Sequence, residues 1–247
     1  MHYDESCLKI LFISEIPIES LIEENKVLIN RVSDFYKFVE YSTLTQPLMW
    51  QPIPNYQYLL AANRIEVLRA ITDFKNGEVN KAVSHLQNQF SKTRQMFELQ
   101  DDMIGKLVFL KELSELMDVL SIFLSESNLI VDAIPSLSQS ELDFSQVAVR
   151  EFGYTYSTFK ELDKDPSIFG EGGNTPGWIT RMVYKPNMTI NAIAPFHQRL
   201  IKLAQLTPSE FLYDIKNADD INTETSKIRN FYGNKVTFFG GPDYHQY

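Results

Sequence analysis

Apolar residues recur at steps of three and four along most of this 247-residue chain, and this spacing constrains the fold more than any other feature. The steps match one face of an α-helix, whereas a half-buried strand would show strict alternation. Stripes of this kind run over residues 17–41, 56–76, 79–97, 101–125, 138–165, 187–204 and from 207 onward. The spacing predicts an all-α protein, an array or bundle of about eight amphipathic helices with little or no sheet.

A short turn at Gly77 joins two of these helices. Gly77 follows Asn76 directly, as glycine does when it ends a helix, and the next stripe begins at Val79. Two amphipathic helices with a short glycine turn form an αα-hairpin. Its centre, residues 74–82, is similar to the middle of a tetratricopeptide unit, but the chain holds one such unit and a repeat array needs about three or more. We therefore expect a local hairpin inside a bundle.

The helix predicted over residues 101–125 is the most hydrophobic one and is apolar on two sides. The first side holds Met103, Leu107, Leu110, Leu113, Met117, Leu120 and Leu124, and the second holds Ile104, Val108, Leu116, Val119 and Phe123. A helix that is apolar on two sides is expected to pack against neighbours on both, so this one should be central. Three carboxylates at three-residue spacing, Glu112, Glu115 and Asp118, are expected to form a solvated face.

A linker over residues 125–137 suggests how the chain is organised. We predict an N-terminal helical part over residues 1–127 and a C-terminal helical part over residues 138–247, packed together as one domain. With 247 residues and 44% hydrophobic residues, the chain is large enough to bury a substantial apolar core.

Local signals mark the helix starts in the C-terminal part. Ser138 and Glu141 stand at capping-box spacing and predict a helix there, and Thr207 and Glu210 predict another in the same way. Pro195 lies inside an apolar stripe. Because proline cannot donate its backbone hydrogen bond, the helix that contains it should be kinked or should start late.

Charge and composition restrict the partners. The net charge is −9 and the pI is about 5.0, whereas nucleic-acid binders normally carry a basic surface, so we expect no nucleic-acid binding. No stretch approaches the roughly 18 apolar residues of a membrane span, and membrane contact is expected only through a segment absent from this chain. The single cysteine, Cys7, excludes an intramolecular disulfide and a cysteine-based zinc site.

Motifs that carry chemistry do not occur at recognised spacings. The four histidines, His2, His85, His197 and His245, stand outside the patterns of zinc proteases and di-iron proteins. The glycine-rich loop at residues 170–174 lacks the ending of a phosphate-binding loop. We therefore assign no catalytic residue, no metal ligand and no cofactor. His197 lies near an apolar stripe and is expected to be a hydrogen-bonded structural histidine.

Arg94 is the most informative charged residue. It lies on the same helical stripe as Phe90 and Phe97, so its stem should be buried and its guanidinium paired. Asp101 and Asp102 stand at the start of the next helix and are the candidate partners. We predict a structural ion pair between Arg94 and one of these two aspartates.

A candidate binding surface lies between residues 174 and 191. It combines Trp178, Arg181, Tyr184 and Asn187, and interaction hot spots are enriched in tryptophan, tyrosine and arginine. A loop held in place by a buried tryptophan is the alternative explanation. Asn187 is also the expected N-cap of the helix that follows.

Several short motifs follow one another in order over most of the chain. They are Cys7-Leu8-Lys9, the proline-rich connection up to Pro54, the helix pair around Gly77 and Ala82, Arg94, Met103–Lys106, Tyr184–Asn191, Tyr232-Gly233-Asn234 and Gly240-Gly241-Pro242-Asp243-Tyr244. In this order the chain resembles a family of uncharacterised, N-terminally membrane-anchored helical proteins of Gram-negative bacteria. The resemblance implies a periplasmic or inner-membrane-anchored full-length protein, and it implies a location more than an activity.

These observations favour a non-enzymatic helical module that binds another protein, at the bacterial envelope. The alternative is a small-ligand-binding protein or an enzyme whose site is assembled from residues distant in sequence, because such sites need no local motif. Self-association with a purely structural role is a third hypothesis.

Overall fold

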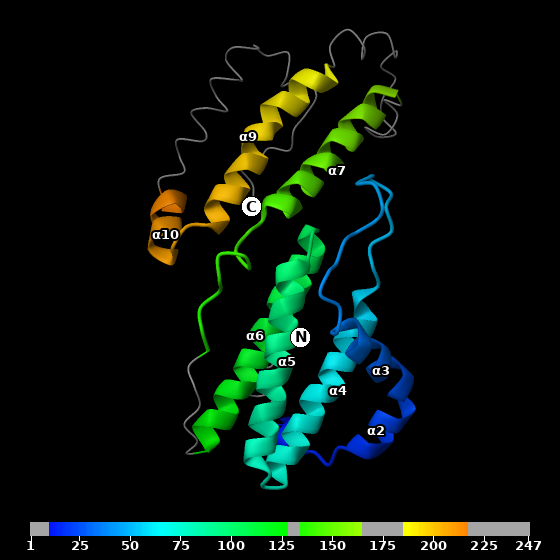
Figure 1. Cartoon of the computed structure of the whole chain (residues 1–247), viewed down its shortest axis with the longest axis vertical. Coiled ribbons are helices and arrows are strands. Elements are labelled where there is room, and N and C mark those ends of the chain that lie inside the picture. The colour runs from blue at the N-terminus through cyan, green and yellow to red at the C-terminus, as the bar shows by residue number, and fades with distance from the viewer. Residues whose placement is uncertain (1–9, 128–133, 165–184, 217–247) are drawn as a thin grey trace. The chain divides into compact units, whose positions relative to one another are not determined.

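The computed structural model describes residues 10–127, 134–164 and 185–216. Every regular element within these ranges is a helix, so the all-α prediction is confirmed (Figure 1). Contacts divide the chain into two compact units, one of residues 1–45 with 51–147 and one of residues 46–50 with 148–247. The division falls ten residues beyond the end of the predicted linker, and the packing of both parts as one domain stays a prediction.

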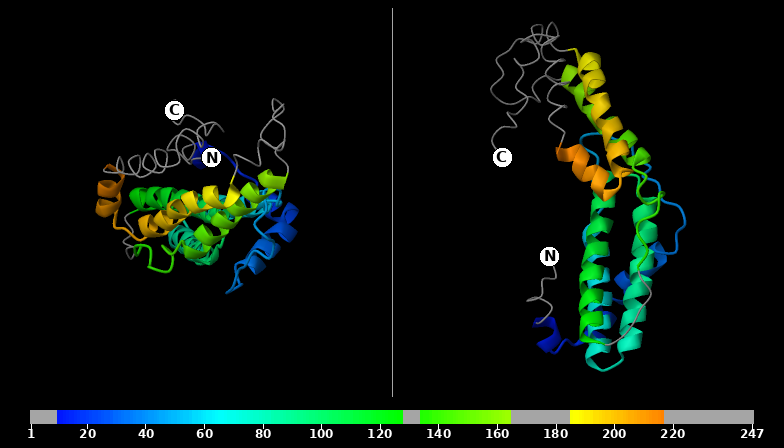
Figure 2. Two further views of the ribbon diagram at one scale, coloured as in Figure 1. Left: turned by 90° about the horizontal axis from the view of Figure 1, so that it is seen from above. Right: turned by 90° about the vertical axis from the view of Figure 1, so that its left-hand side faces the viewer.

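The first unit is a bundle of antiparallel helices. Its helices are α2 (Ile18–Glu24), α3 (Lys26–Phe35), α4 (Tyr56–Lys75), α5 (Val79–Leu99) and α6 (Met103–Glu126). Helix α5 packs against both α4 and α6, while α2 and α3 pack on α4. Figure 1 and the right-hand view of Figure 2 show α4, α5 and α6 lying side by side. No helix in the described ranges combines the length and the apolar content that a bilayer crossing requires.

The turn between α4 and α5 confirms the predicted αα-hairpin. Gly77 has a φ of +83°, a left-handed conformation that glycine adopts without strain. The Gly77 amide donates to the Phe74 carbonyl at 3.0 Å and the Glu78 amide donates to the Asp73 carbonyl at 2.9 Å. This pair of bonds is a Schellman motif, which satisfies the last carbonyls of α4 and reverses the chain.

The single long helix predicted over residues 17–41 is wrong. The chain forms two shorter helices, α2 and α3, because Asn25 leaves the helical backbone region with φ −106° and ψ 12°. The Asn25 side chain donates to the Leu21 carbonyl at 2.9 Å, which satisfies one carbonyl at the end of α2. Such local side-chain bonds let asparagine compete with the helical backbone pattern.

Aromatic packing closes the core of the first unit. Phe74 from α4 stacks on Phe123 from α6 with ring centroids 4.3 Å apart, and Phe12 meets both rings edge-on. Phe97 and Phe109 are also fully enclosed. Each such side chain contributes about 1.5–3 kcal/mol through burial alone, so this cluster is a main source of the bundle's stability.

Helix α6 is covered only in part on its two predicted apolar sides. Leu113 of the first side and Leu116 and Val119 of the second are buried, whereas Leu107 and Met117 of the first side are exposed. This corrects the prediction of a central helix. The periodicity shows that two sides are apolar, but the packing of α4 and α5 covers only part of this surface.

The second unit contains α7 (Ser145–Lys164) from Ala148 onward, together with α9 (Pro186–Ala204) and α10 (Pro208–Lys216). Residues 46–50 pack against α7, because Gly153 leaves room for the ring of Pro47. A Cβ atom at Gly153 would lie 2.5 Å from Pro47 Cγ. The Ser157 hydroxyl donates to the Pro47 carbonyl at 2.7 Å, which holds the segment in place.

The capping box at Thr207 is confirmed as the start of α10. The Thr207 amide donates to the Glu210 carboxylate at 2.9 Å, and the Glu210 amide donates back to the Thr207 hydroxyl at 3.4 Å. Helix α9 begins at Pro186 and continues through Pro195, so the late start expected there is wrong.

The capping box at Ser138 forms its bonds without starting a helix. The Ser138 amide donates to Glu141 and the Glu141 amide donates to the Ser138 hydroxyl, yet the chain makes only one turn there. The helix begins at Ser145, whose amide donates to Asp143 at 2.8 Å.

Candidate functional site

A buried polar cluster links four helices of the first unit around Asn63. The Asn63 amide group donates to Glu112 at 2.9 Å, and its oxygen accepts from Gln89 at 2.8 Å and from the Tyr36 hydroxyl at 3.1 Å. Tyr36 caps the end of α3, and the other three residues come from α4, α5 and α6. A single amide side chain therefore ties together the helices that form the core.

The Glu112 carboxyl group is the most perturbed acid of this cluster. It is 4% exposed, and burial raises its pKa to about 7. The hydrogen bond from Asn63 lowers the pKa, and the nearby Glu115 charge raises it. At neutral pH this group is therefore divided between its protonated and charged forms, which is unusual for a glutamate.

The expectation of a solvated carboxylate face on this helix is wrong. Glu112 and Glu115 are both buried, and Lys111 contacts the Glu115 carboxylate at 2.7 Å from the edge of the helix. Three-residue spacing places side chains on one face of a helix. The spacing does not show which face of the helix is covered by neighbouring helices.

Tyr36 shows that the cluster is enclosed. Its hydroxyl is buried, and burial raises its pKa to about 12 even though Thr93 and Asn63 offer hydrogen bonds. Tyr36, Asn63, Gln89, Thr93 and Glu112 are each less than a tenth exposed. Because a substrate has no direct approach to them, the cluster serves the packing of the helices.

Arg94 forms the predicted structural ion pair, but with another partner. Its Nε and Nη2 atoms donate to the two oxygens of Glu141, so the pair is bidentate. Asp101 instead accepts from the amide and hydroxyl of Thr43 at 2.7 and 2.6 Å. Asp102 caps α6 by accepting from the Gly105 amide at 2.7 Å. Both predicted partners are therefore committed elsewhere.

The guanidinium of Arg94 also holds the end of the linker. Nη1 donates to the Pro135 carbonyl at 2.7 Å, and Nη2 donates to the Ser136 carbonyl at 3.0 Å. The paired guanidinium lowers the pKa of Glu141 to about 2. No local pattern in the sequence indicates this pairing, because Glu141 lies 47 residues from Arg94 and has the spacing of a capping box with Ser138.

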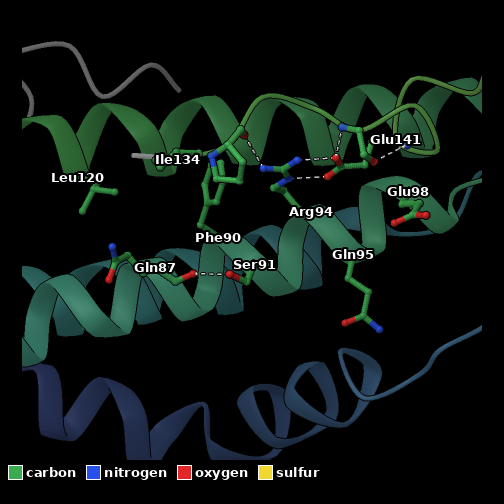
Figure 3. A pocket seen from close by; sticks show the side chains of 11 residues that line it. Gln87, Phe90, Ser91, Arg94, Gln95, Glu98, Leu120, Ile134 and Glu141 are labelled. Carbon is green, nitrogen blue, oxygen red and sulfur yellow. Dashed lines mark hydrogen bonds and ion pairs between the residues drawn. The ribbon is translucent and has the colours of Figure 1, made fainter. Parts of the chain in front are cut away.

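An open hollow of about 590 Å³ adjoins this ion pair (Figure 3). Its apolar lining comes from Phe90, Leu120 and Ile134, and its polar lining includes Gln87 and Gln95. Figure 3 shows the Arg94 guanidinium directed at Glu141 and at the chain beside it. Its donors are used within the protein, so the hollow offers no free guanidinium to an anionic ligand.

Lys106 is a second buried cation in this region. It is 1% exposed, donates to the Glu98 carbonyl at 3.1 Å, and lies over the rings of Phe97 and Phe144 at 4.5 and 5.4 Å. Burial lowers its pKa. The two rings partly replace water around the ammonium group, so Lys106 fixes Phe144 at the point where the chain enters α7.

In the second unit His197 is a buried histidine. Its Nε2 atom lies 3.4 Å from the Thr155 hydroxyl, and the Phe152 ring packs against it edge-on. Burial lowers its pKa, which favours the neutral imidazole. These contacts agree with the predicted structural histidine.

The predicted binding surface lies mostly outside the described residues. This holds for Trp178, Arg181 and Tyr184. Asn187 is described, but it is not the N-cap, because α9 begins one residue earlier and Lys185 caps it. The Asn187 side chain accepts from Lys160 at 2.9 Å and thereby links α9 to α7.

The exposed side of α6 is the clearest candidate for an interaction. Leu107, Leu110 and Met117 are 57%, 44% and 46% exposed. They belong to a row at alternating steps of four and three residues, which we call the α6 seam. Its members are Met103, Leu107, Leu110, Ser114, Met117, Ser121 and Leu124. The sequence contained this signal in the first apolar side of the helix, to which Leu107, Leu110 and Met117 belong.

Comparison with known proteins does not place the chain in a family. No family model matches it, and neither a curated protein nor a solved structure is significantly similar. The resemblance to membrane-anchored helical proteins therefore stays a prediction. In the part of the chain that the structure describes, no group of three or more His, Cys, Asp or Glu side chains is placed to hold a metal ion.

Proposed function

We propose that this chain is a non-enzymatic helical protein-interaction module that binds its protein partner through the α6 seam. The observation that carries the proposal is the exposure of Leu107, Leu110 and Met117 along one side of a helix whose other side is the core of the bundle. A row of large apolar side chains on a rigid helix is the kind of surface that partner helices recognise.

The polar groups of the first unit support this interpretation. Asn63 and Glu112 bond to each other inside the bundle, and Arg94 is engaged by Glu141 and two carbonyl groups. These groups stabilise the scaffold that presents α6. The resemblance described above supports the bacterial envelope as the compartment.

Small-ligand binding is the second candidate, and the hollow beside Arg94 favours it. The apolar side chains of Phe90, Leu120 and Ile134 could receive an apolar group there. Most of a small ligand's surface is buried in a typical pocket, whereas this hollow is open to solvent. The α6 seam is therefore the better-supported site.

Crosslinking in cells tests the proposal. Leu110→Glu places a charge in the middle of the α6 seam, and Val27→Glu places the same charge on a 66% exposed valine of α3. We expect Leu110→Glu to abolish the capture of specific partners, while Val27→Glu captures them as the wild type does. Both variants should keep the wild-type helical circular-dichroism signal.

Capture of the same proteins by the wild type and Leu110→Glu would contradict this surface assignment. The predicted surface near Asn187 provides a comparison in the same experiment. If Trp178→Ala and Arg181→Ala remove the partners and Leu110→Glu does not, binding belongs to that second surface.

A further inference from the structure

The α6 seam has the spacing of a coiled-coil helix. Leu107, Ser114 and Ser121 repeat every seven residues, and Met103, Leu110, Met117 and Leu124 repeat between them. Alternating steps of three and four residues keep such a row facing one partner helix along its whole length. From Leu107 to Leu124 the row spans about 26 Å at 1.5 Å per residue.

From this pattern we infer that the partner of the α6 seam is the α6 seam of a second copy of this chain, packed antiparallel. The inference rests on the proposed function, since it names the occupant of the same surface. A two-fold axis between residues 115 and 116 would bring the two helices together over their exposed length, and two-fold dimers of this kind are closed assemblies.

The sizes of the side chains favour the antiparallel direction. About this axis Leu110 faces Ser121 of the second copy, Ser114 faces Met117 of the second copy, and Leu107 faces Leu124. Each small side chain then meets a large one, which lets the two surfaces interdigitate. A parallel pair would instead place Ser114 on Ser114 and Ser121 on Ser121, and would bury two layers of hydroxyl groups.

The charges beside the seam favour the same arrangement. Lys111 and Asp118 both directly follow seam residues and lie on the same flank of α6. In the antiparallel pair Lys111 comes opposite Asp118 of the second copy, and the symmetry repeats this contact. Lys111 contacts the buried Glu115 carboxylate at 2.7 Å, yet its side chain is 44% exposed at the helix edge, so its ammonium group can also face a second copy.

The seam is short, so the dimer should be weak. A stable interface usually buries about 800 Å² on each partner, and one side of a single helix supplies less. The net charge of −9 on each copy also opposes association. We therefore expect a dimer that dissociates on dilution and that strengthens when salt screens the repulsion.

Sedimentation of the purified full chain over two orders of magnitude in concentration tests the inference. We expect a monomer at the lowest concentrations and a dimer at the highest. Leu110→Glu should leave a monomer throughout, whereas Val27→Glu should behave as the wild type does. A monomer at every concentration, or a dimer that Leu110→Glu leaves intact, would overturn the inference.

A charge exchange tests the direction of the pair. Lys111→Asp and Asp118→Lys should each weaken dimerisation about tenfold, because each replaces two attractive contacts by two repulsive ones. The double variant Lys111→Asp/Asp118→Lys should restore most of the loss. A double variant weaker than either single variant would exclude the antiparallel arrangement.

Cysteine crosslinking provides a second geometric test, in a Cys7→Ser background that has no other thiol. A mixture of Leu110→Cys and Ser121→Cys chains should form a mixed disulfide under oxidation. Neither variant alone should form a disulfide, because the two introduced thiols of its dimer would lie about 16 Å apart. Disulfides formed by each variant alone would instead show a parallel pair and overturn the inference.

These measurements separate the inference from the proposed function, because they use the purified chain alone. A purified monomer combined with Leu110-dependent capture in cells would keep the proposed function and remove the second copy as the partner.

Discussion

At the scale of single residues, Asn63 determines how the bundle accommodates polar groups. Asparagine is mostly an exposed residue, but here it is 2% exposed and contacts three side chains from other helices. Each of those contacts satisfies a group whose burial would otherwise cost about 1–3 kcal/mol. One of them, Glu112, remains a source of instability because its second oxygen, Oε1, has no hydrogen-bond partner.

The first prediction concerns Glu112. Its folded-state pKa of about 7 lies above its usual value of 4.5, so the folded protein binds this proton more tightly than the unfolded chain does. The free energy of unfolding should therefore fall as pH rises from about 4.5 to about 7, by up to about 3 kcal/mol. Glu112→Gln should remove this loss and be more stable than the wild type at pH 8.

Urea unfolding at pH 4.5 and pH 8 measures this effect. The two proteins should differ little at the lower pH, where the Glu112 carboxyl group is protonated in the folded state and half protonated in the unfolded chain. Glu126→Gln, at the exposed end of α6, is the matched control and should change the stability little at either pH. Equal stability of Glu112→Gln and the wild type at pH 8 would contradict the assignment.

At the scale of elements, two cations attach the chain between α6 and α7 to the bundle. Arg94 on α5 holds Pro135, Ser136 and Glu141, and Lys106 on α6 lies against Phe144. Residues 134–144 have little regular structure of their own. Their path is therefore set by side chains of helices that precede them in the sequence.

The second prediction follows for Arg94. Arg94→Ala should release residues 134–141 from α5, and limited proteolysis should then cleave this segment several times faster than in the wild type. Arg94→Lys should restore only part of the protection, because an ammonium group cannot reproduce the fork that binds both Glu141 oxygens and two carbonyl groups. Arg69→Ala, which removes a surface pair with Glu66, is the control and should leave the cleavage rate unchanged. Equal cleavage of Arg94→Ala and the wild type would contradict the anchoring role.

At the scale of the whole molecule, the excess of acidic residues is the dominant electrostatic feature. The chain carries 32 acidic and 23 basic side chains, which leaves a net charge of −9. Many of the ion pairs, such as Lys37 with Asp34, are exposed and contribute less than about 1 kcal/mol each. Repulsion between the unpaired acids should therefore outweigh the attraction within the exposed ion pairs. Salt screens both interactions, so its net effect should be stabilising.

The third prediction concerns ionic strength. Raising NaCl from about 20 mM to about 300 mM at pH 8 should raise the midpoint of thermal unfolding by a few degrees, because the Debye length falls to less than the spacing of surface charges. Differential scanning calorimetry measures this shift, and the Leu110→Glu variant separates it from dimerisation. A lower midpoint at high salt in that variant would show that the ion pairs dominate instead.

Local signals in the sequence predicted most of the helices. Gly77, the stripes of α4, α5 and α6, and the capping box at Thr207 act over a few residues, so their effect is readable without the fold. The break at Asn25 was missed, although asparagine is a common residue at helix ends. The apolar stripe continued on both sides of it, and periodicity alone does not detect a change in helix axis.

The candidate site was predictable only in part. The sequence indicated that α6 is apolar on two sides and that Arg94 is paired. It did not indicate that Glu141 is the partner, or that Asn63 and Glu112 meet inside the bundle. Asn63 does lie on the apolar stripe of α4, four residues from Leu59 and from Val67, and this position was the available signal.

The sequence by itself determined which segments are helical and which of their sides are apolar, since both depend on neighbours within about four residues along the chain. Only the tertiary structure decided which apolar residues of α6 are buried, which acid Arg94 binds and why Glu112 is enclosed. These outcomes depend on contacts between helices that are dozens of residues apart in sequence. Burial and pairing arise from that packing, because a side chain loses its water only when another element covers it.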